Sequence, residues 1–311
     1  MKKISGMAIL SICIITAIVS SAGAQSLTEF NTNNLAVPAG ELLPGGPPKD
    51  GIPALVDPEM IDLSAADYLD NESRVVVVDI DGDVRAYPIP ILNWHEIVND
   101  VIEGTPVAVV YCPLCDSVSV VDRRLDGEVY EFGVSGYLYE SNVLMYDRTD
   151  DALWSQVGMN AISGPNAGQS LDHLPWEIMT FAALQDTYPE ASVLSRDTGH
   201  HRNYAGNPYE SYFRSGRLMF PISKEDDRLP KMEPVVGVKA GETVLAYPVS
   251  SIVEAEGGVL DDRLQNERLL IEADDSGRVS VVELPSEAQV VHTFWFTWAA
   301  LHPETEIHNE N

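Results

Sequence analysis

Hydrophobic residues in this chain gather in short runs of β-branched side chains, and each run is closed by a turn signal. Val75–Ile80 is one such run, Asp81-Gly82-Asp83 follows as a turn, and Val84–Pro88 returns. Short apolar runs rich in Val, Ile and Tyr predict buried strands, and a brief Gly-containing interval between two of them predicts a hairpin. Thr105–Tyr111 predicts another buried strand, and the alternating, β-branched residues 116–122 predict the strand after it.

Three short helices are also predicted, around Asn93–Asn99, Trp176–Tyr188 and Thr297–Leu301. Predicted strands outnumber these helices along the whole chain. The pattern therefore indicates an α+β fold that is rich in strands, in which the few helices cover sheets instead of forming a bundle.

Two sequence echoes divide the chain into related halves. The strand, turn and Ala-Tyr-Pro sequence at 75–88 recurs at 235–248, an offset of 235 − 75 = 160. A second echo pairs 181–190 with 298–305, an offset near 298 − 181 = 117, so the second copy is shorter. Two echoes in the same order indicate duplication of a small α+β unit. The alternative is chance recurrence of common tripeptides.

Duplication predicts a domain organisation. A first half at 54–230 holds the internal cysteine motif, and a shorter, degenerate second half occupies 231–311. Because no flexible linker separates them, the two halves are expected to pack as one compact body. The segment missing from the second copy is expected to include the counterparts of the cysteines, so any chemistry should belong to the first half.

The N-terminus carries the pattern of an export signal. Lys2 and Lys3 precede an uncharged stretch at 4–19, and small residues at 20–24 end in Ala24. This order is typical of a secretory signal peptide, with cleavage expected after Ala24. The alternative is an uncleaved membrane anchor. Cleavage predicts a periplasmic or secreted protein with no stable transmembrane span, followed by an extended tail at 25–53 rich in Asn, Pro and Gly.

Charge and cysteine content narrow the function further. The 311 residues include 19 Lys and Arg against 48 Asp and Glu, a formal net charge of −29. Removal of the signal changes this to 17 − 48 = −31, and a surface of that sign disfavours nucleic acid as a partner. Cys13 leaves with the signal, so the mature chain keeps only Cys112 and Cys115, in an oxidising compartment.

The Cys112-Pro113-Leu114-Cys115 sequence is the sharpest chemical signal. It is compatible with a tight disulfide, a redox couple, or two thiolate ligands for a metal. If it served only to stabilise the fold, a disulfide closing so short a loop would contribute only about 2 kcal/mol to the free energy of unfolding. A strand follows the motif where thioredoxin-like proteins have a helix, so the thioredoxin arrangement is disfavoured.

A metal such as zinc or copper needs further ligands beyond Cys112 and Cys115. His95, in the predicted helix before the cysteine strand, is the first candidate, and Asp116 directly follows the motif. The alternative for His95 is a hydrogen-bonded histidine in a packed turn. Asp116 is also expected to act on the thiols, as a carboxylate that raises a thiol pKa.

The segment after the cysteines is dense in polar and aromatic residues. Tyr146, Asp147, Arg148, Trp154 and Gln156 are candidates for the wall of a binding pocket. The alternative is a β-rich core with capped turns.

A serine hydrolase is a distant third interpretation of the same segment. Ser135 lies in Gly133-Val134-Ser135-Gly136, which lacks the spacing and the strand–elbow–helix context of a hydrolase nucleophile.

Several motifs in this order resemble one family. They are Arg85-Ala86-Tyr87-Pro88, Asn93-Trp94-His95-Glu96, Tyr111–Cys115, Phe132–Gly136, Met145–Arg148, Leu153–Gln156 and Phe294-Trp295-Phe296. Together they are similar to domain-of-unknown-function family 3179, over about residues 55 to 308. The resemblance implies an exported or membrane-linked prokaryotic protein, with no activity or cofactor to carry over. Where the family commonly has glycine after the second cysteine, this chain has Asp116.

Two hypotheses follow. The first is an exported metal-binding or thiol-redox protein that works through Cys112 and Cys115. The second is a non-catalytic binding or scaffold protein in which the two cysteines form a structural disulfide. In that case Tyr146, Arg148 and Trp154 line a recognition groove.

Overall fold

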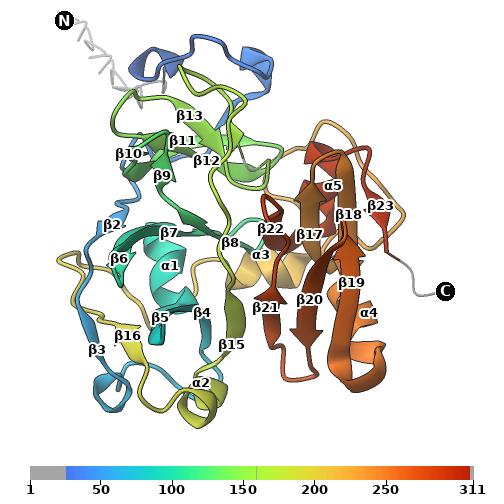
Figure 1. The fold of residues 1–311 in the computed structure, drawn as a ribbon. Helices are drawn as coiled ribbons and strands as arrows, with labels where there is room; N and C mark the ends of the chain where they lie inside the picture. The colour runs from blue at the N-terminus through green and yellow to red at the C-terminus, as the bar shows by residue number, and fades with distance from the viewer. Residues whose placement is uncertain (1–25, 159, 309–311) are drawn as a thin grey trace, which may run out of the picture.

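The computed structural model describes residues 26–158 and 160–308, and its architecture is built mainly from strands (Figure 1). The strand-rich α+β class is confirmed. The predicted signal peptide at 1–24 lies outside the described residues. Within the described part, no helix is long and apolar enough to cross a membrane.

Sheet I has eight strands. They are β3 (Met60–Asp62), β4 (Arg74–Ile80), β5 (Asp83–Pro88), β15 (Glu177–Thr180), β16 (Ser192–Leu194), β19 (Val259–Leu264), β20 (Glu267–Ala273) and β21 (Val279–Glu283). Their order in space is β19-β20-β21-β15-β4-β5-β16-β3.

Sheet II also has eight strands. They are β2 (Leu55–Val56), β6 (Ile97–Ile102), β7 (Thr105–Cys112), β8 (Ser117–Asp122), β17 (Pro234–Ala240), β18 (Thr243–Pro248), β22 (Gln289–Phe294) and β23 (Glu306–Ile307). Their order is β2-β6-β7-β8-β22-β17-β18-β23.

Sheet III is smaller and orders β1 (Leu43–Pro44), β11 (Phe132–Tyr139), β12 (Asn142–Asp147), β13 (Leu153–Ser155) and β14 (Asn160–Ala161). A two-stranded ribbon pairs β9 (Arg124–Leu125) with β10 (Glu128–Val129). The helices are α1 (Ile89–His95), α2 (Phe181–Thr187), α3 (Glu210–Ser215), α4 (Val249–Glu254) and α5 (Trp295–Leu301).

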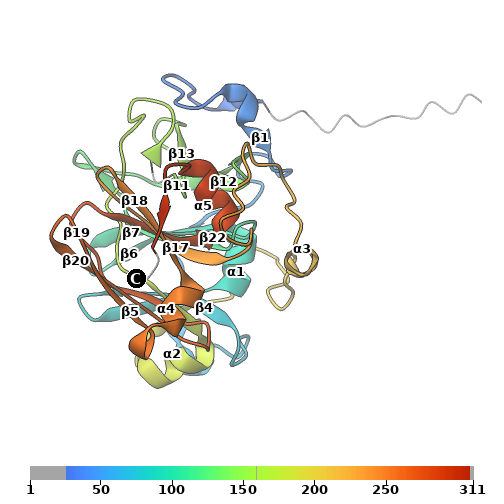
Figure 2. The same ribbon diagram turned by 90° about the vertical axis from the view of Figure 1, so that its right-hand side faces the viewer.

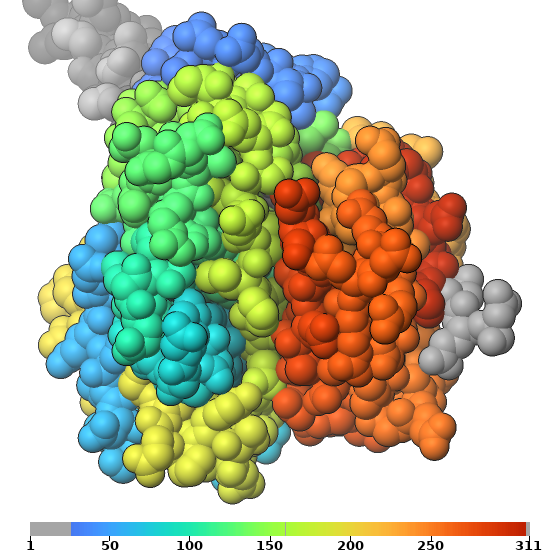
Figure 3. Space-filling view, in the orientation of Figure 1, coloured from blue at the N-terminus to red at the C-terminus, as the bar shows by residue number. Residues whose placement is uncertain are grey.

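The two eight-stranded sheets each contain strands from both halves of the chain. In sheet I, the meander β19-β20-β21 of the second half pairs through β15 with the β4–β5 hairpin of the first. In sheet II, the meander β6-β7-β8 of the first half pairs through β22 with the β17–β18 hairpin of the second. The two halves therefore share both large sheets, and their surfaces are in direct contact (Figure 3). Common descent of the two halves stays a prediction.

The Ala-Tyr-Pro echo has a local physical reason. The Tyr87 hydroxyl donates to Asp100 Oδ2 at 2.7 Å, and the Tyr247 hydroxyl donates to Asp262 Oδ2 at 2.8 Å. Each tyrosine is buried near the end of a hairpin strand, and each aspartate lies on the strand that follows the next helix. A buried phenol needs a hydrogen-bond partner, so each half supplies a carboxylate at the same place.

The main core fills the space between sheets I and II. Valines of β4 and β17, Tyr111 of β7 and Ile271 of β20 belong to the same buried cluster. A second cluster lies on the other face of β7 and contains Cys112 and Cys115, together with residues of sheet III. Alternate residues of β7 therefore serve two different cores, as the period of a strand requires.

The predicted helices are partly misplaced along the chain. The helix predicted at Asn93–Asn99 begins at Ile89, with Pro90 in its first turn, and Ile97 already belongs to β6. In the segment predicted at Trp176–Tyr188, residues 177–180 form β15. Ile97 pairs with Val110 of β7, and Ile178 lies between β4 and β21, so pairing within the sheets overrides the local helical preference.

The tail predicted at 25–53 packs against sheet III. Phe30 and Leu42 are buried in a cluster with Tyr137 and Tyr146, and β1 pairs with β11. Two 3-10 turns, Leu27–Glu29 and Ala39–Glu41, precede β1.

Candidate functional site

The two cysteines lie in the turn of the β7–β8 hairpin. β7 ends at Cys112, β8 begins at Ser117, and these two residues pair across the ladder. The Phe294 N–H of β22 donates to the Cys115 carbonyl at 2.9 Å and anchors the turn. Both cysteines are free thiols and almost fully buried, with 1% and 0% of their surface exposed. The turn thus brings two reduced sulfurs close enough to hydrogen-bond to each other.

Cys115 has polar partners from three segments of the chain. Its thiol donates to Ser117 Oγ at 3.2 Å, and Asn142 Nδ2 donates to the sulfur at 3.3 Å. Thr293 Oγ1 of β22 donates to the Cys115 carbonyl oxygen at 3.4 Å, and Thr293 also lowers the pKa of the thiol. Hydrogen bonds received by a sulfur favour its thiolate form.

Gln156 organises these donors. Its Oε1 accepts from Ser117 Oγ at 2.6 Å and from Asn142 Nδ2 at 2.8 Å. Its Nε2 donates to the carbonyls of Val110 and Ser117, both at 3.2 Å. Ser117 has a single hydrogen, which points to Gln156 while the Cys115 thiol donates to Ser117. When Cys115 is a thiolate, that hydrogen can turn to the sulfur, while Asn142 still satisfies Gln156.

Burial acts to raise the pKa of both thiols, but hydrogen bonds to the sulfur offset this effect only at Cys115. For Cys112, burial and then the neighbouring Cys115 thiol raise the pKa well above its usual value. For Cys115, burial acts in the same direction, yet the hydrogen bonds to its sulfur outweigh it, that of Cys112 first, and the pKa is lowered. The two thiols are therefore not equivalent: Cys115 loses its proton more readily, and Cys112 is the thiol that donates a hydrogen bond to it.

Glu96 is a buried carboxyl group beside this pair. It follows α1 with a left-handed backbone (φ 58°), and its carbonyl accepts the Tyr111 N–H at 2.7 Å. Burial, and then the charge of Cys115, raise the pKa of Glu96 to about 8. A carboxyl group of this kind is protonated at neutral pH and can exchange a proton with a nearby sulfur.

A helix covers the thiols. Tyr212 of α3 donates its hydroxyl to the Leu114 carbonyl, between the two cysteines, at 2.6 Å. Tyr209 and Phe213 pack against the cluster that contains both sulfurs. Figure 2 shows α3 at the periphery of the molecule, outside α1. α3 thus packs on the cysteine turn from outside the sheets.

His95 has its two ring nitrogens engaged elsewhere. Nδ1 lies 2.7 Å from the Pro53 carbonyl oxygen, and Nε2 lies 2.6 Å from the Tyr204 hydroxyl. Burial lowers the pKa of His95 to about 4, so the ring is neutral. The hydrogen bonds of His95 thus lie toward Pro53 and Tyr204, whereas the charge of Glu96, its neighbour in the chain, interacts with the sulfurs.

Asp116 turns away from the thiols into a separate ionic network. Both of its oxygens accept from Arg74 Nη1 at 3.0 Å, and Oδ1 accepts from the Tyr111 hydroxyl at 2.9 Å. His292 Nε2 lies 3.7 Å from Oδ2. Although burial raises the pKa of Asp116, Arg74 and the other donors lower it well below its usual range. The backbone is left-handed at this position (φ 48°), which explains why glycine suits it and why aspartate is tolerated.

The aromatic and charged residues predicted to line a pocket make contacts within sheet III and with the tail. The Tyr146 hydroxyl donates to Asp50 Oδ2 at 2.5 Å, and Arg148 donates to both Asp50 oxygens at 3.0 Å. Trp154 Nε1 donates to Asp147 Oδ2 at 2.8 Å, and Trp154 is 2% exposed. Of the predicted set, Gln156 is the residue that the structure connects to the thiols.

Ser135 is buried within sheet III. Its hydroxyl donates to the Leu144 carbonyl at 2.5 Å and accepts the Tyr137 N–H at 3.0 Å. These backbone contacts describe a structural serine on β11.

Most of sheet III comes from a segment of the first half that has no counterpart in the second half. Its strands β11 to β14 are inserted between β8 and β15, whereas in the second half only residues 284–288 separate β21 from β22. The β20–β21 connection, 274–278, takes the place in its sheet that the cysteine turn takes in sheet II, but it contains no cysteine. Asn142 and Gln156 both come from the inserted segment, so the insertion carries the donors to the thiol turn.

The side chains around the thiols bear on whether the pair could hold a metal ion. Within residues 26–158 and 160–308, no group of three or more His, Cys, Asp or Glu side chains is arranged to hold a metal ion. Two thiolates alone leave a zinc ion short of its usual four ligands.

Comparison with known families agrees with this arrangement of motifs. The model of the family described as "protein of unknown function (DUF3179)" matches residues 49–289. The chain belongs to the DUF3179 family. The match includes β4 to β21 and with them the cysteine turn, sheet III and α3. No curated protein and no solved structure matches this DUF3179 chain.

Sequence reasoning missed three residues of the site. Glu96 stood in a quoted motif, but a carboxyl group directly after a helical segment gives no sign of burial. Ser117 and Asn142 are common polar residues in strands, and only the packing of sheet III on the hairpin brings Asn142 to the sulfur. One available signal was closeness in the sequence, because Ser117 follows Cys115 by two residues across a tight turn.

Proposed function

We propose that this protein is an exported thiol-redox protein in which Cys112 and Cys115 cycle between a dithiol and a disulfide. The observation that carries the proposal is the pair of hydrogen bonds on the buried Cys115 sulfur, which donates to Ser117 and accepts from Asn142. A structural cysteine in an apolar core has no need of such polar partners, whereas a nucleophilic thiolate does. The N-terminal signal pattern supports export.

The chemistry is thiol–disulfide exchange with a disulfide substrate. The Cys115 thiolate attacks one substrate sulfur, forms a mixed disulfide and releases the other sulfur as a thiolate. The Cys112 thiol then loses its proton and attacks the Cys115 sulfur, which releases the second substrate thiolate. Two electrons pass from the pair to the substrate. The Cys112 proton balances one product thiolate, and the other product thiolate takes its proton from solvent.

Glu96 has a supporting role in this sequence. Its charge interacts with both sulfurs, and its raised pKa keeps it protonated while Cys115 is a thiolate. After Cys115 is consumed in the mixed disulfide, the carboxylate form is less disfavoured. Glu96 can then give its proton to the substrate thiolate that leaves first, and its carboxylate can accept the Cys112 proton. The buried site therefore holds its own proton acceptor.

Access requires movement of α3. Both sulfurs are covered, and the Tyr212–Leu114 hydrogen bond ties α3 to the cysteine turn. One neutral hydrogen bond contributes about 1 kcal/mol, so this contact restrains the helix without locking it.

The test combines redox titration with alkylation of the mature protein. The protein is equilibrated in dithiothreitol buffers of graded potential and then alkylated, and the pair is counted by mass spectrometry. We expect a reversible two-electron transition. In Cys112→Ser, the remaining Cys115 should react with iodoacetamide at a lower pH than the remaining Cys112 does in Cys115→Ser.

Two results would contradict the proposal. A disulfide that resists reduction throughout, together with unchanged folding of the Cys112→Ser/Cys115→Ser double variant, would indicate a structural staple in a binding protein. Stoichiometric zinc or copper in anaerobically purified protein, absent from the double variant, would indicate a metal site instead.

A further inference from the structure

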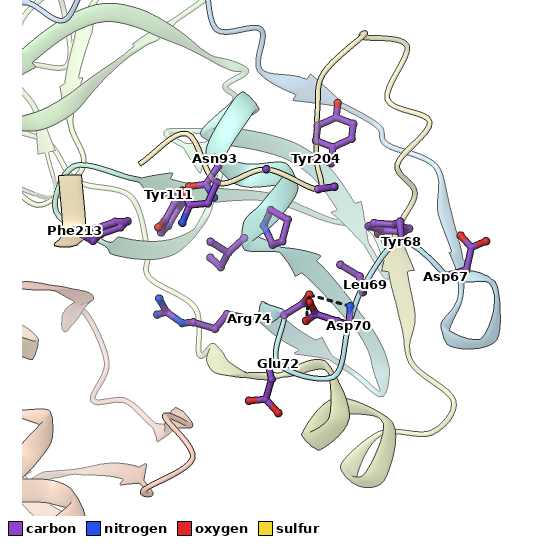
Figure 4. A pocket seen from close by; sticks show the side chains of 16 residues that line it. Asp67, Tyr68, Leu69, Asp70, Glu72, Arg74, Asn93, Tyr111, Tyr204 and Phe213 are labelled. Carbon is purple, nitrogen blue, oxygen red and sulfur yellow. Dashed lines mark hydrogen bonds between the residues drawn. The ribbon is translucent and has the colours of Figure 1, made fainter. Parts of the chain in front are cut away.

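A cavity of about 510 Å³ opens beside α1, apart from the thiol site (Figure 4). It lies between residues 67–74, the first turns of α1 and residues 204–207, and Phe213 of α3 closes one end. Tyr111 lines it from the face of β7 opposite to the cysteines, which are not among its lining residues. Cavities of this size bind small organic molecules.

Arg74 offers unused donors at this cavity. Within the described residues, its hydrogen bonds run through Nη1 alone, to both oxygens of Asp116. A guanidinium has five N–H groups, so Nε and Nη2 remain for another acceptor. The Arg74 side chain is 38% exposed. The Nε–Nη2 edge of an arginine matches the two oxygens of a carboxylate.

Asn93 offers an unused acceptor close by. The residue is 5% exposed and lines the cavity from α1. Its Oδ1 is buried and has no hydrogen-bond partner in the described part of the chain. A buried carbonyl without a partner is rare in folded proteins, and a ligand N–H would satisfy it.

Aromatic rings form the remaining wall. The hydroxyl groups of Tyr68, Tyr111 and Tyr204 are bound to Leu194, Asp116 and His95 respectively. Since their polar ends are engaged, these residues present mainly ring surface, as Phe213 does. An apolar or aromatic group can pack there.

The rim of the cavity is acidic. Asp67, Asp70 and Glu72 line it, and in Figure 4 Asp67 and Glu72 point outward, away from Arg74. The charge of Arg74 is already balanced by Asp116. A purely anionic ligand would therefore be repelled on entry, whereas a ligand that also carries a positive group would not.

We propose that this cavity binds a free α-amino acid. The carboxylate binds Nε and Nη2 of Arg74, the ammonium group donates to Asn93 Oδ1, and the side chain packs on the rings of Tyr111 and Phe213. An α-amino acid carries both charged groups on one carbon, and this cavity is lined by both the donor, Arg74, and the acceptor, Asn93. This inference does not rest on the thiol chemistry of Cys112 and Cys115.

Calorimetric titration of the full mature chain tests the ligand class. The probes are the standard L-amino acids, followed by the N-acetyl and amide derivatives of each one that binds. We expect at least one free amino acid to bind with a Kd below about 1 mM, and both derivatives to bind at least tenfold more weakly. Lack of binding by every free amino acid overturns the proposal, as does equal binding of either derivative.

Two variants test the assigned residues. Asn93→Leu removes the acceptor, and Arg74→Lys keeps a cation for Asp116 but loses the Nε–Nη2 edge. Each should weaken binding at least tenfold. Gln185→Leu, the same kind of change on the exposed face of α2, is the control and should bind as the parent does. If Asn93→Leu fails to fold, the result for Arg74→Lys is the test. A folded variant of either kind that binds the amino acid with the affinity of the parent contradicts the assignment.

Discussion

Asn142 Nδ2 lies 3.3 Å from Cys115 Sγ, although the two residues belong to different sheets. Asn142 comes from the inserted sheet III, and Cys115 from a hairpin turn of sheet II. The same nitrogen also lies 2.8 Å from Gln156 Oε1, which fixes its direction. The contact is therefore a built feature of the interface between the two sheets, and it makes Cys115 chemically different from Cys112.

Replacement of Asn142 should slow the reaction of Cys115. Asn142→Leu removes a donor to the thiolate, and a hydrogen bond to a charged group contributes about 1.5 kcal/mol or more. In the Cys112→Ser background, we expect iodoacetamide to react about tenfold more slowly at pH 7. Asn166→Leu, which changes a buried asparagine bound to the Tyr130 hydroxyl, is a matched control. Equal rates in the two variants would remove Asn142 from the site.

Loosening α3 should expose the thiols. Tyr212→Phe removes the hydroxyl that donates to the Leu114 carbonyl. Loss of about 1 kcal/mol of restraint predicts alkylation of the pair about fivefold faster. Tyr209→Phe removes a hydroxyl from the residue just before the same helix and should have a smaller effect. The measurement is the rate of thiol modification in the reduced protein at constant pH; no acceleration would show that access follows another route.

The stability of the protein should fall as pH rises from about 4.5 to 8 because of Glu96. Its pKa is about 8 in the folded state against an ordinary value of 4.5, so the folded protein holds a proton that the unfolded chain releases. Unfolding free energy therefore declines between about pH 4.5 and 8. Glu96→Gln should abolish this decline and be more stable at pH 8, by an amount on the order of 4 kcal/mol. Urea unfolding at pH 5 and pH 8 measures the change in the free energy of unfolding. The same change in the parent and in Glu96→Gln would contradict the assignment.

Asp116 should contribute in the opposite pH direction. Its pKa in the folded state is depressed, so its contribution is complete above about pH 4 and is lost as pH falls below that value. Asp116→Asn keeps a residue that tolerates the left-handed backbone while it removes the charge facing Arg74. We expect a loss of about 2 to 4 kcal/mol at pH 7, because the pair is broken from one side. Denaturant unfolding at pH 7 and pH 3 should show the difference narrowing at the lower pH.

The local pattern predicted much of the framework. Thr105–Tyr111 and residues 116–122 were expected as strands, and they form β7 and β8 with the cysteines in the turn between them. The period of hydrophobic residues and the presence of turn residues depend on only a few neighbouring positions, so the sequence alone is enough to predict strands and turns from them. The shift of the first helix to Ile89–His95 reflects the pairing of Ile97 in sheet II, which is a tertiary contact.

The sequence by itself determined the strand-rich α+β class, the family, and the Cys112–Cys115 motif as the concentrated chemical signal. Only the tertiary structure decided which groups surround the sulfurs. Asp116 is adjacent to Cys115 in the chain, yet it turns to Arg74, whereas Asn142 reaches the sulfur from a strand 27 residues away. The reason is physical. Strand identity depends on local periodicity, but the environment of a buried thiol depends on which distant segments pack around it, and here two interlocked halves and an inserted sheet determine that packing.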